Sequence, residues 1–524
     1  MQISTGLVDP APDRVFARLT SAHLIALLTV AALGIRIIGL DLRPLWLDEA
    51  YSAWFAARGW HELWTSVPTY ETHPPFYYSL LKLWSEIAGD SAVALRSFSV
   101  LLGLLTIPVV AAIVAEQERP SPSSRPMLRA AIAMFLCAFS PTLVFIDQEA
   151  RPYALMTLAF AIAIFGIIRL LGEFRAGGAG TIGSWAILAI GAEVTLWSHA
   201  LGALYALALA LALAPAWLAR PIDGARLKRG TAAAAIVLLA YIPCLLMILG
   251  RASGWERAGF DWRGGMPLRL LQIYSVPLTP LTLSGAIAVA TMTFLGWQAI
   301  LTGVRTPRNS PDRALILLWL VPPALVIVIS LTWMPIFVPR TLSASLVPAW
   351  LAMAGALARS ELRIARIATG GALVAMLVPI SVQVARQPPL ERWNDVSAYL
   401  SAHVAKGDQV WLYPNDSALP LSAASPDATY AVRAIPADYP ATDFNGPSRS
   451  GSPAVPSLTR EQAKRLANSP EVRRIPTIWL VTRQSAIFDP DGDLPRSLLL
   501  HRHPGKLREW GYIAVRPYYA AASR

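Results

Sequence analysis

Charged residues are scarce in this chain of 524 residues, of which only 15% are charged while 55% are hydrophobic. Soluble domains carry about a quarter charged residues, so this scarcity excludes an ordinary soluble protein and predicts a polytopic membrane protein. The net charge of +12 comes from basic residues in short clusters between apolar runs, without one basic patch. That distribution is typical of membrane topology and argues against a nucleic-acid partner.

The chain also has only two cysteines and lacks the common nucleotide-binding motifs. The two cysteines, Cys137 and Cys244, lie inside apolar runs and form no CxxC motif. We interpret them as small buried hydrophobic residues rather than metal ligands. Neither GxxxxGK nor GxGxxG occurs, so no nucleotide cofactor is expected. The sequence also shows no internal repeat of the kind that marks transporters built from duplicated halves.

Long apolar runs dominate what the sequence does contain. Crossing the hydrocarbon core of a bilayer takes about 20 residues of helix, and this criterion predicts about eleven spans. The first run shows no small-residue cleavage site, so we expect a retained span rather than a removed signal peptide. The expected spans are 22–40, 92–115, 130–146, 152–170, 183–198, 201–219, 230–250, 280–304, 313–333, 341–358 and 367–385.

The basic residues predict the orientation of these spans, because Lys and Arg near span ends are retained in the cytoplasm. With the N-terminus in the cytoplasm, most basic residues between the spans fall on the inner side. We therefore expect a transmembrane domain at 1–386, with a first outer loop at 41–91. The remaining chain, 387–524, is then an extracytoplasmic domain.

The sequence after residue 386 differs in kind from the spans. Its apolar runs are short and strand-like, and they alternate with helical stretches, which predicts a small α/β domain. The segment 436–457 is rich in Pro, Ser and Gly and predicts a long loop. The expected strands lie at 409–414, 429–435, 477–482 and 512–519, and the expected helices near 393–405 and 458–467.

The first outer loop carries most of the candidate chemistry. Its adjacent acids Asp48 and Glu49 follow the first span, and Glu71 stands two residues before His73. Ionisable residues at span ends that face a bundle interior are functional candidates, as general bases or as cation ligands. The acidic pair is equally compatible with a cap on a helix that begins at Ala50.

Other predicted outer segments carry ionisable residues too, and short loops between packed helices lie near one another. We therefore expect these groups to converge on one outward cavity, where arginine suits the phosphate of an anionic, lipid-linked substrate. Structural interpretations stay open: an ion pair within one turn, a histidine at a helix end and an arginine that snorkels to the interface. The residues are Glu149, Arg151, His199, Arg340 and the charged stretch 251–263.

Several motifs, taken in chain order, resemble those of the GT-C membrane glycosyltransferases. The likeness covers roughly residues 22–385 and is nearest to the dolichyl-phosphate-mannose protein mannosyltransferase type, with the lipid A aminoarabinose transferases and the lipopolysaccharide-core galacturonosyltransferases. The chain departs from common patterns at Ala200 and Thr341, where an aromatic residue is frequent. The motifs are IRIIGLDLRPLWLDEAYSAW, ETHPPFYYSLLKLW, LRSFSVLLGLL, DQEARPY, LWSHA and PIFVPR.

The resemblance implies that a sugar moves from a polyprenyl-phosphate donor to an envelope acceptor on the outer face of a bacterial inner membrane. Lipid A or its core, a polysaccharide, a protein or another lipid are the acceptors it allows. It implies Asp48 as the catalytic carboxylate, Glu149 as its assistant and Arg340 beside the donor phosphate. Membrane lipids are expected to surround the spans, whichever acceptor is used.

The resemblance also bears on the metal and on the donor phosphate, because Glu71 and His73 match a stretch that contributes to a divalent-metal or donor-phosphate site. The convergence of outer residues adds Glu49, Arg151 and His199 to His73 and Arg340 as expected substrate-binding residues. A polytopic transporter or a non-catalytic envelope assembly protein is the alternative. A transporter holds its substrate near the bilayer midplane, whereas the ionisable residues here lie at outer span ends.

Overall fold

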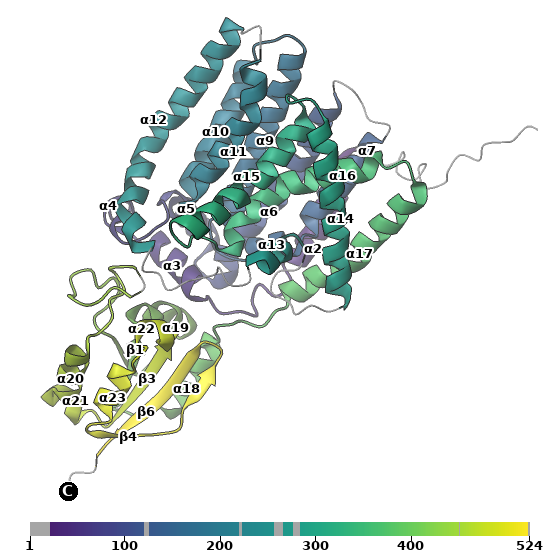
Figure 1. The fold of residues 1–524 in the computed structure, drawn as a ribbon. Coiled ribbons are helices and arrows are strands. Elements are labelled where there is room, and N and C mark those ends of the chain that lie inside the picture. The colour runs from purple at the N-terminus through teal and green to yellow at the C-terminus, as the bar shows by residue number, and fades with distance from the viewer. Residues whose placement is uncertain are drawn as a thin grey trace, which may run out of the picture.

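The chain folds into a bundle of apolar helices followed by a smaller domain built on a β-sheet (Figure 1). The predicted fold class, a polytopic helical membrane protein with a C-terminal α/β domain, is confirmed. The boundary expected after residue 386 stays a prediction. In this computed structural model the described residues are 21–119, 125–219, 223–255, 266–275, 283–449 and 451–521.

The helices of the bundle coincide with the predicted apolar runs. Seven described helices are long and apolar enough to cross a membrane. The helices α7 (Pro126–Ala138) and α8 (Pro141–Asp147), which meet at a 52° bend, together have the length and composition of either a broken span or a re-entrant loop. Shorter apolar helices occupy the other predicted runs. The protein is therefore a multi-pass membrane protein. The other helices are α2 (Ser21–Arg36), α6 (Ala92–Glu118), α9 (Tyr153–Arg175), α10 (Ile182–Ser198), α11 (Gly202–Trp217), α12 (Gly224–Trp255), α13 (Met266–Ser275), α14 (Leu283–Arg305), α15 (Pro311–Thr332), η2 (Pro339–Ser345), α16 (Leu346–Arg359) and α17 (Arg363–Ala385).

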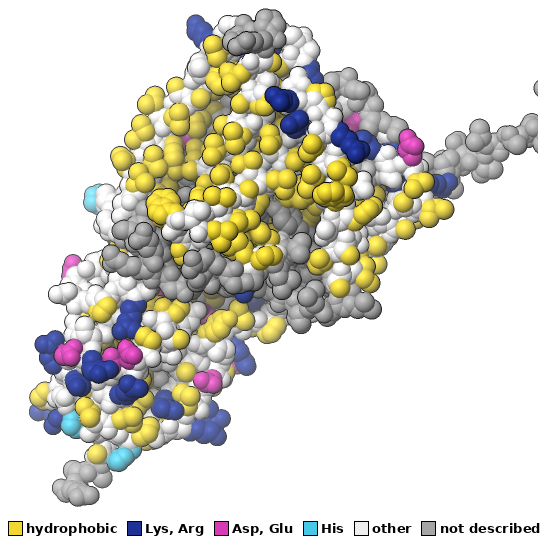
Figure 2. Space-filling model, in the orientation of Figure 1, with side chains coloured by type: hydrophobic (Ala, Val, Ile, Leu, Met, Phe, Trp, Pro, Cys, Tyr) yellow, Lys and Arg dark blue, Asp and Glu magenta, His cyan; other side chains and the backbone are white. Residues whose placement is uncertain are grey.

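Burial separates central helices from lipid-facing ones. Within the apolar window of α9, 83% of the residues are buried inside the protein, against 11% for α12. Figure 2 shows the consequence on one face: apolar side chains cover the helical part, and charged side chains gather near its end and over the sheet domain. An apolar outer surface of this kind is stable in hydrocarbon, where the helices satisfy their own backbone hydrogen bonds.

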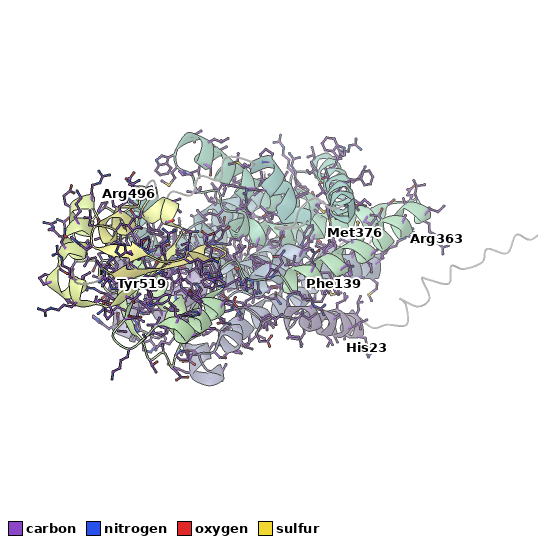
Figure 3. All side chains as sticks on the ribbon, turned by 90° about the horizontal axis from the view of Figure 1, so that it is seen from below. His23, Phe139, Arg363, Met376, Arg496 and Tyr519 are labelled. Atoms are coloured by element: carbon purple, nitrogen blue, oxygen red, sulfur yellow. The ribbon has the colours of Figure 1, made fainter. Side chains whose placement is uncertain are left out.

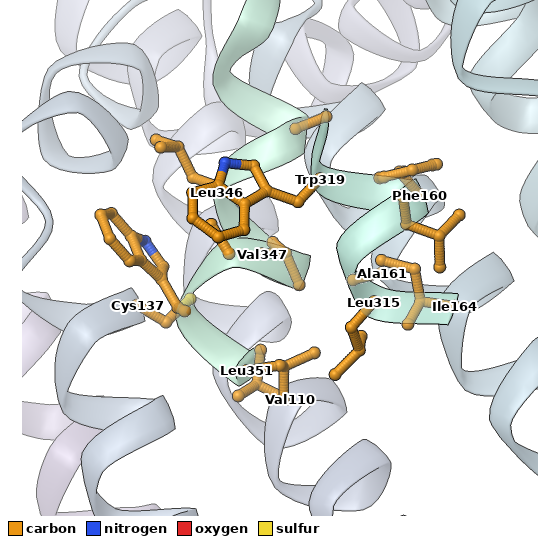
Figure 4. Close-up of a cluster of buried hydrophobic side chains, with 14 of the residues drawn as sticks. Val110, Cys137, Phe160, Ala161, Ile164, Leu315, Trp319, Leu346, Val347 and Leu351 are labelled. Carbon is orange, nitrogen blue, oxygen red and sulfur yellow. The ribbon is translucent and has the colours of Figure 1, made fainter. Parts of the chain in front are cut away.

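The centre of the bundle forms where α9 packs against α6 and α10. Small residues allow the close approach: a Cβ on Gly191 of α10 would stand 2.5 Å from the backbone nitrogen of Ala163 in α9. Such contacts are typical of helix interfaces in membranes. Figure 4 shows the buried side chains that fill the space between α9, α15 and α16, among them Phe160, Trp319 and Leu351.

A buried ion pair fixes α2 against α8, next to the turn 148–152 between α8 and α9, which is the second predicted outer turn. Nε of Arg36 donates to Oδ2 of Asp147 over 2.8 Å, and Nη1 donates to the carbonyl of Ala138 over 2.8 Å. Gly103 of α6 lies against this carboxylate, because a Cβ there would stand 2.1 Å from Oδ2. Charges inside a membrane bundle are costly unless they are paired, so this pair anchors the turn.

The first outer loop folds into short helices. The helix that carries the acidic pair begins at Leu47, three residues before the position expected from the sequence. Asp48 and Glu49 therefore lie inside its first turn instead of preceding it. The alternative that these acids cap a helix beginning at Ala50 is therefore wrong about where the helix starts. The helices of the loop are α3 (Leu47–Ala56), α4 (Trp60–Thr65), η1 (Val67–Thr69) and α5 (Phe76–Ala88).

The C-terminal domain contains a mixed sheet with the strand order β2-β1-β3-β6-β4, and β5 pairs with β6. Parallel pairing joins β1 to β2 and β3, whereas β6 runs antiparallel to β3. All four predicted strands and both predicted helices are present. The elements are α18 (Trp393–His403), β1 (Gln409–Tyr413), η3 (Asn415–Ser417), α19 (Ala418–Ala424), β2 (Ala431–Ala434), α20 (Arg460–Asn468), α21 (Pro470–Arg474), β3 (Thr477–Arg483), α22 (Ser485–Phe488), α23 (Asp493–Leu498), β4 (Arg502–Pro504), β5 (Arg508–Trp510) and β6 (Ile513–Ala520).

Both faces of the sheet are covered, as its alternating side chains require. Val410 and Leu412 of β1 pack on the side of α18, whereas Trp411 packs on the side of α20 and α21. In Figure 3 the labelled Tyr519 and Arg496 lie in this domain, away from His23 and Arg363 of the helical part. The sheet is thus the core of a layered α/β domain.

The C-terminal domain packs directly on the first outer loop. Phe55 and Tyr70 of the loop share one buried cluster with Val455 and Phe488 of the domain. The ring of Tyr439 lies across this contact, 5.1 Å from that of Trp54 and 6.2 Å from that of Tyr70. The predicted long loop 436–457 therefore serves as the apolar contact between the domain and the bundle.

Candidate active site

An ion pair between the first outer loop and η2, the short helix that carries Arg340, marks the candidate site. Nη2 of Arg340 lies 2.6 Å from Oδ2 of Asp48, although 292 residues separate them in the chain. The Arg340 side chain is 32% exposed and the Asp48 side chain 22%. The pair is therefore packed into the protein yet open to an incoming molecule, as a site for a substrate must be.

Two aromatic residues hold the guanidinium in place. Nε of Arg340 donates to the hydroxyl of Tyr153, the first residue of α9, over 2.8 Å. The guanidinium carbon lies 4.9 Å from the ring centroid of Trp46, within the range of a cation–π contact. The fork of Arg340 is thus oriented from two sides, and its remaining donors are available to an anionic group.

The neighbouring acid, Glu49, has different surroundings. It is fully buried, and both of its oxygens accept from Arg96 of α6, over 2.8 and 2.6 Å. The amide of Ala150 donates to the same carboxylate over 3.0 Å. Arg96 also donates to the carbonyls of Leu40 and Arg43. Glu49 thereby ties α3 to α6 and to the second outer turn, and its part in substrate binding stays a prediction.

We expect Glu49→Gln to destabilise the protein by about 3–5 kcal/mol, because it leaves the buried Arg96 without its counter-ion. The measurement is thermal unfolding of the purified protein in detergent. Glu86→Gln is the matched control: the Glu86 side chain is 57% exposed and pairs with Lys82 at 4.0 Å, and pairs near the surface contribute about 0–1 kcal/mol. Equal unfolding temperatures for the two variants would contradict the structural role of Glu49.

The second outer turn contributes Glu149 and Arg151. Nη1 of Arg151 donates to the backbone carbonyl of Asp48 over 3.0 Å, which steadies the start of α3. Glu149 is buried, and its Oε2 has no hydrogen-bond partner among the described residues. Burial raises the pKa of the Glu149 carboxyl to about 7, against the opposing effect of Arg340. The alternative of an ion pair between Glu149 and Arg151 is not realised, and the two residues are joined only by the Arg151 amide, which donates to the Glu149 carbonyl over 2.8 Å.

Two histidines from different loops meet beside this group. The ring centroids of His73 and His199 are 4.3 Å apart, and that of His199 is 5.6 Å from Tyr153. Nδ1 of His199 accepts from the amide of Leu201 over 3.1 Å, so its proton belongs on Nε2. Burial lowers the pKa of His199 to about 3 and that of His73 well below its usual value. Both rings are neutral donors or acceptors.

Glu71 does not complete a metal-binding group with His73. Its Oε1 accepts from the backbone amide of His73 over 3.0 Å, and burial raises the pKa of this carboxyl. No three His, Cys, Asp or Glu side chains within the described part of the chain are placed to hold one ion, whereas protein metal sites commonly use three or more ligands. A divalent cation held by Glu71 and His73 therefore stays a prediction, and every role proposed below belongs to the side chains themselves.

The structure adds three residues to the site that sequence reasoning did not assign. Tyr153 and Trp46 contact Arg340, and Arg96 holds Glu49. A signal was present, because Tyr153 closes the DQEARPY motif and Trp46 stands two residues before Asp48. The side chains of the charged stretch 251–263 lie outside the described residues.

The whole fold is similar to solved membrane glycosyltransferases. The structure of ArnT from Cupriavidus metallidurans bound to undecaprenyl phosphate aligns with a TM-score of 0.61 at 13% identity, over 96% of this chain and 99% of that one. The chain has the GT-C fold. The oligosaccharyltransferase of Archaeoglobus fulgidus aligns with a TM-score of 0.51 at 14% identity, over 96% of this chain and 75% of that one.

A third GT-C structure, the arabinofuranosyltransferase AftD from Mycobacteria, aligns with a TM-score of 0.52 at 17% identity. It matches 96% of this chain but 40% of its own length. No protein-family model and no curated protein matches the sequence. The GT-C fold is thus shared with enzymes of different substrates.

Proposed function

We propose that this protein is an inverting membrane glycosyltransferase that moves a sugar from a polyprenyl-phosphate donor to an envelope acceptor. The ion pair between Asp48 and Arg340 carries the proposal, because it joins a partly exposed carboxylate to a guanidinium that suits phosphate. The GT-C fold is consistent with it, and ArnT, a structural neighbour, is bound to undecaprenyl phosphate.

In the proposed reaction the carboxylate of Asp48 accepts the proton of an acceptor hydroxyl. The hydroxyl oxygen attacks C1 of the donor sugar, the bond between C1 and the phosphate oxygen breaks, and the polyprenyl phosphate leaves with the bond electrons. One displacement inverts the configuration at C1 and needs no covalent enzyme intermediate. General-base catalysis of this kind contributes about 10²–10⁴-fold.

Arg340 stabilises the negative charge that develops on the departing phosphate. Its contact with Asp48 has a second consequence, because a phosphate that draws the guanidinium away frees the carboxylate for the acceptor. The neutral His199 is buried beside Tyr153, and its Nε2–H has no partner among the described residues. It is available to donate to a sugar hydroxyl or a phosphate oxygen without adding charge.

The outward orientation of the site and a bacterial inner-membrane location belong to the same proposal. Basic residues near the opposite ends of the spans support it.

The proposal is tested with purified protein and labelled polyprenyl-phosphate sugars. Release of free polyprenyl phosphate together with a glycosylated acceptor from an envelope extract is the expected result. Uptake of the sugar into vesicles without cleavage of the donor would instead identify a transporter. Binding of the donor without either outcome would identify a non-catalytic assembly protein.

We expect the rate of transfer to rise with pH through about 7. Glu149 assists as a carboxylate, and its raised pKa of about 7 leaves it protonated below that pH. Each pH unit below this value should therefore reduce the rate about tenfold. The measurement is kcat/KM from pH 5 to 9, with Glu149→Gln as the comparison. If kcat/KM of Glu149→Gln still falls below about pH 7, the pH dependence belongs to another group.

A further inference from the structure

Helix α3, which carries Asp48, begins without a cap from its own segment. Its N-cap residue, Trp46, makes no side-chain hydrogen bond to the first turn. The amide of Leu47, the first residue of the helix, donates instead to Oε2 of Glu391 over 2.9 Å. Glu391 lies 344 residues away, at the start of the C-terminal domain. A carboxylate at a helix N-terminus supplies both an acceptor and a favourable charge.

Glu391 belongs to a buried network inside the C-terminal domain. The indole of Trp393 donates to the same oxygen over 2.9 Å, and Nη1 of Arg483 lies 3.5 Å from the other oxygen. Nη2 of Arg483 lies 3.5 Å from Oδ2 of Asp416. Arg483, which is buried, therefore stands between two buried carboxylates of its own domain.

The second carboxylate also reaches α3. The hydroxyl of Tyr51 donates to Oδ2 of Asp416 over 2.6 Å. Tyr51 follows Asp48 by three residues, so the two side chains lie on neighbouring positions of one helix face. The network thus grips the helix at two points, one before Asp48 and one after it.

We propose that Glu391, Asp416 and Arg483 are positioning residues through which the C-terminal domain sets the place of the catalytic carboxylate on α3. The inference rests on the proposed function of Asp48. No hydrogen bond or ion pair joins any of the three to Asp48 or Arg340, so we assign their main effect to the placement of the helix, while their charges also act on Asp48 at longer range. Catalysis depends steeply on such placement, because an error of about 1 Å costs about 10²-fold in rate.

Domain attachment alone does not account for these residues. The apolar contact made by Tyr439, Val455 and Phe488 already joins the domain to the first outer loop. Buried charges add desolvation costs that apolar residues of similar size avoid. The charged network adds a fixed orientation of α3, because the hydrogen bonds from the Leu47 amide and the Tyr51 hydroxyl hold the helix at two points.

The test uses Glu391→Gln and Tyr51→Phe in the full-length protein. An amide at position 391 cannot satisfy Leu47, Trp393 and Arg483 as the carboxylate does, and Tyr51→Phe removes one hydroxyl from the opposite side of the contact. Glu471→Gln is the matched control, because Glu471 is 73% exposed and pairs with Arg433 in the same domain. We expect kcat to fall about 10–100-fold in the two test variants, with the KM for the donor changed less than about twofold.

Two further measurements separate positioning from general destabilisation. In the Asp48→Asn background, Glu391→Gln should add no further loss, since both changes act through one carboxylate. Hydrogen exchange of the peptide that contains Leu47 should become about fivefold faster in Glu391→Gln and stay unchanged in Glu471→Gln.

The outcomes distinguish this inference from the proposed function. If the unaltered protein transfers sugar and Glu391→Gln does so as fast as Glu471→Gln, the positioning role is overturned. Additive losses with Asp48→Asn overturn it as well. If the unaltered protein cleaves no donor, the proposed function fails, and the exchange measurement alone decides: unchanged exchange at Leu47 overturns the contact, and faster exchange supports it.

Discussion

Asp48→Asn is expected to lower sugar transfer by about 10²–10⁴-fold while the protein stays folded, because the amide cannot accept the proton of the attacking hydroxyl. The fold tolerates the change, since the ion pair with Arg340 is partly exposed and pairs of that kind contribute about 0–1 kcal/mol. The measurement is release of polyprenyl phosphate under single-turnover conditions, together with thermal unfolding of the same preparation.

Asp41→Asn is the control for this experiment. Asp41 is an exposed acid at the start of the same loop, and its replacement changes the charge by the same amount without touching Arg340. A folded Asp48→Asn variant with near-normal turnover would show that another group takes the proton. Glu149 would then be the next candidate, because it is buried near the same arginine and titrates near neutral pH.

Arg340→Gln is expected to reduce kcat by about 10²–10³-fold, which is the usual effect of removing one donor that stabilises developing negative charge. Binding of the leaving group should weaken too, so that free polyprenyl phosphate becomes a poorer inhibitor. Arg340→Lys keeps the charge but loses the planar fork held by Tyr153 and Trp46. It should recover only part of the activity.

Arg359→Gln provides the matched comparison for Arg340→Gln. Arg359 closes α16 and pairs with Asp312 at 3.1 Å, at the opposite end of that helix from η2. We expect its transfer rate and its inhibition by polyprenyl phosphate to match those of the unaltered protein. Unchanged inhibition in Arg340→Gln would place the donor phosphate elsewhere, with Arg151 as the nearest alternative.

The two adjacent acids of the first outer loop illustrate what local sequence leaves undecided. Asp48 and Glu49 have the same charge and nearly the same chemistry, and the sequence allowed a helix cap for both. Arg96, 47 residues away from Glu49, takes both oxygens of that acid. Asp48, in contrast, pairs with Arg340, which is 292 residues away in the chain. Distant partners, which no local pattern contains, decide which acid is free.

The helix boundaries and the surroundings of Glu71 show the same limit. Apolar runs predicted the spans because their length alone satisfies the bilayer, and alternation predicted the strands. At the start of α3 the amide of Leu47 donates instead to the carboxylate of Glu391, 344 residues away, which no local pattern contains. Glu71 and His73 are close in sequence, but the carboxylate accepts from the His73 backbone amide, and no three-ligand group forms among the described residues.

The sequence by itself determined that the protein lies in a membrane, and it determined the spans, the C-terminal α/β domain and the loops that carry ionisable residues. Those properties follow from composition and periodicity, which act locally along the chain. Tertiary structure decided the pairing of Asp48 with Arg340, the burial of Glu49 and the grip of Glu391 and Asp416 on α3. The physical reason is that charge pairing and helix capping act through space between residues that lie from 47 to 365 positions apart in the chain.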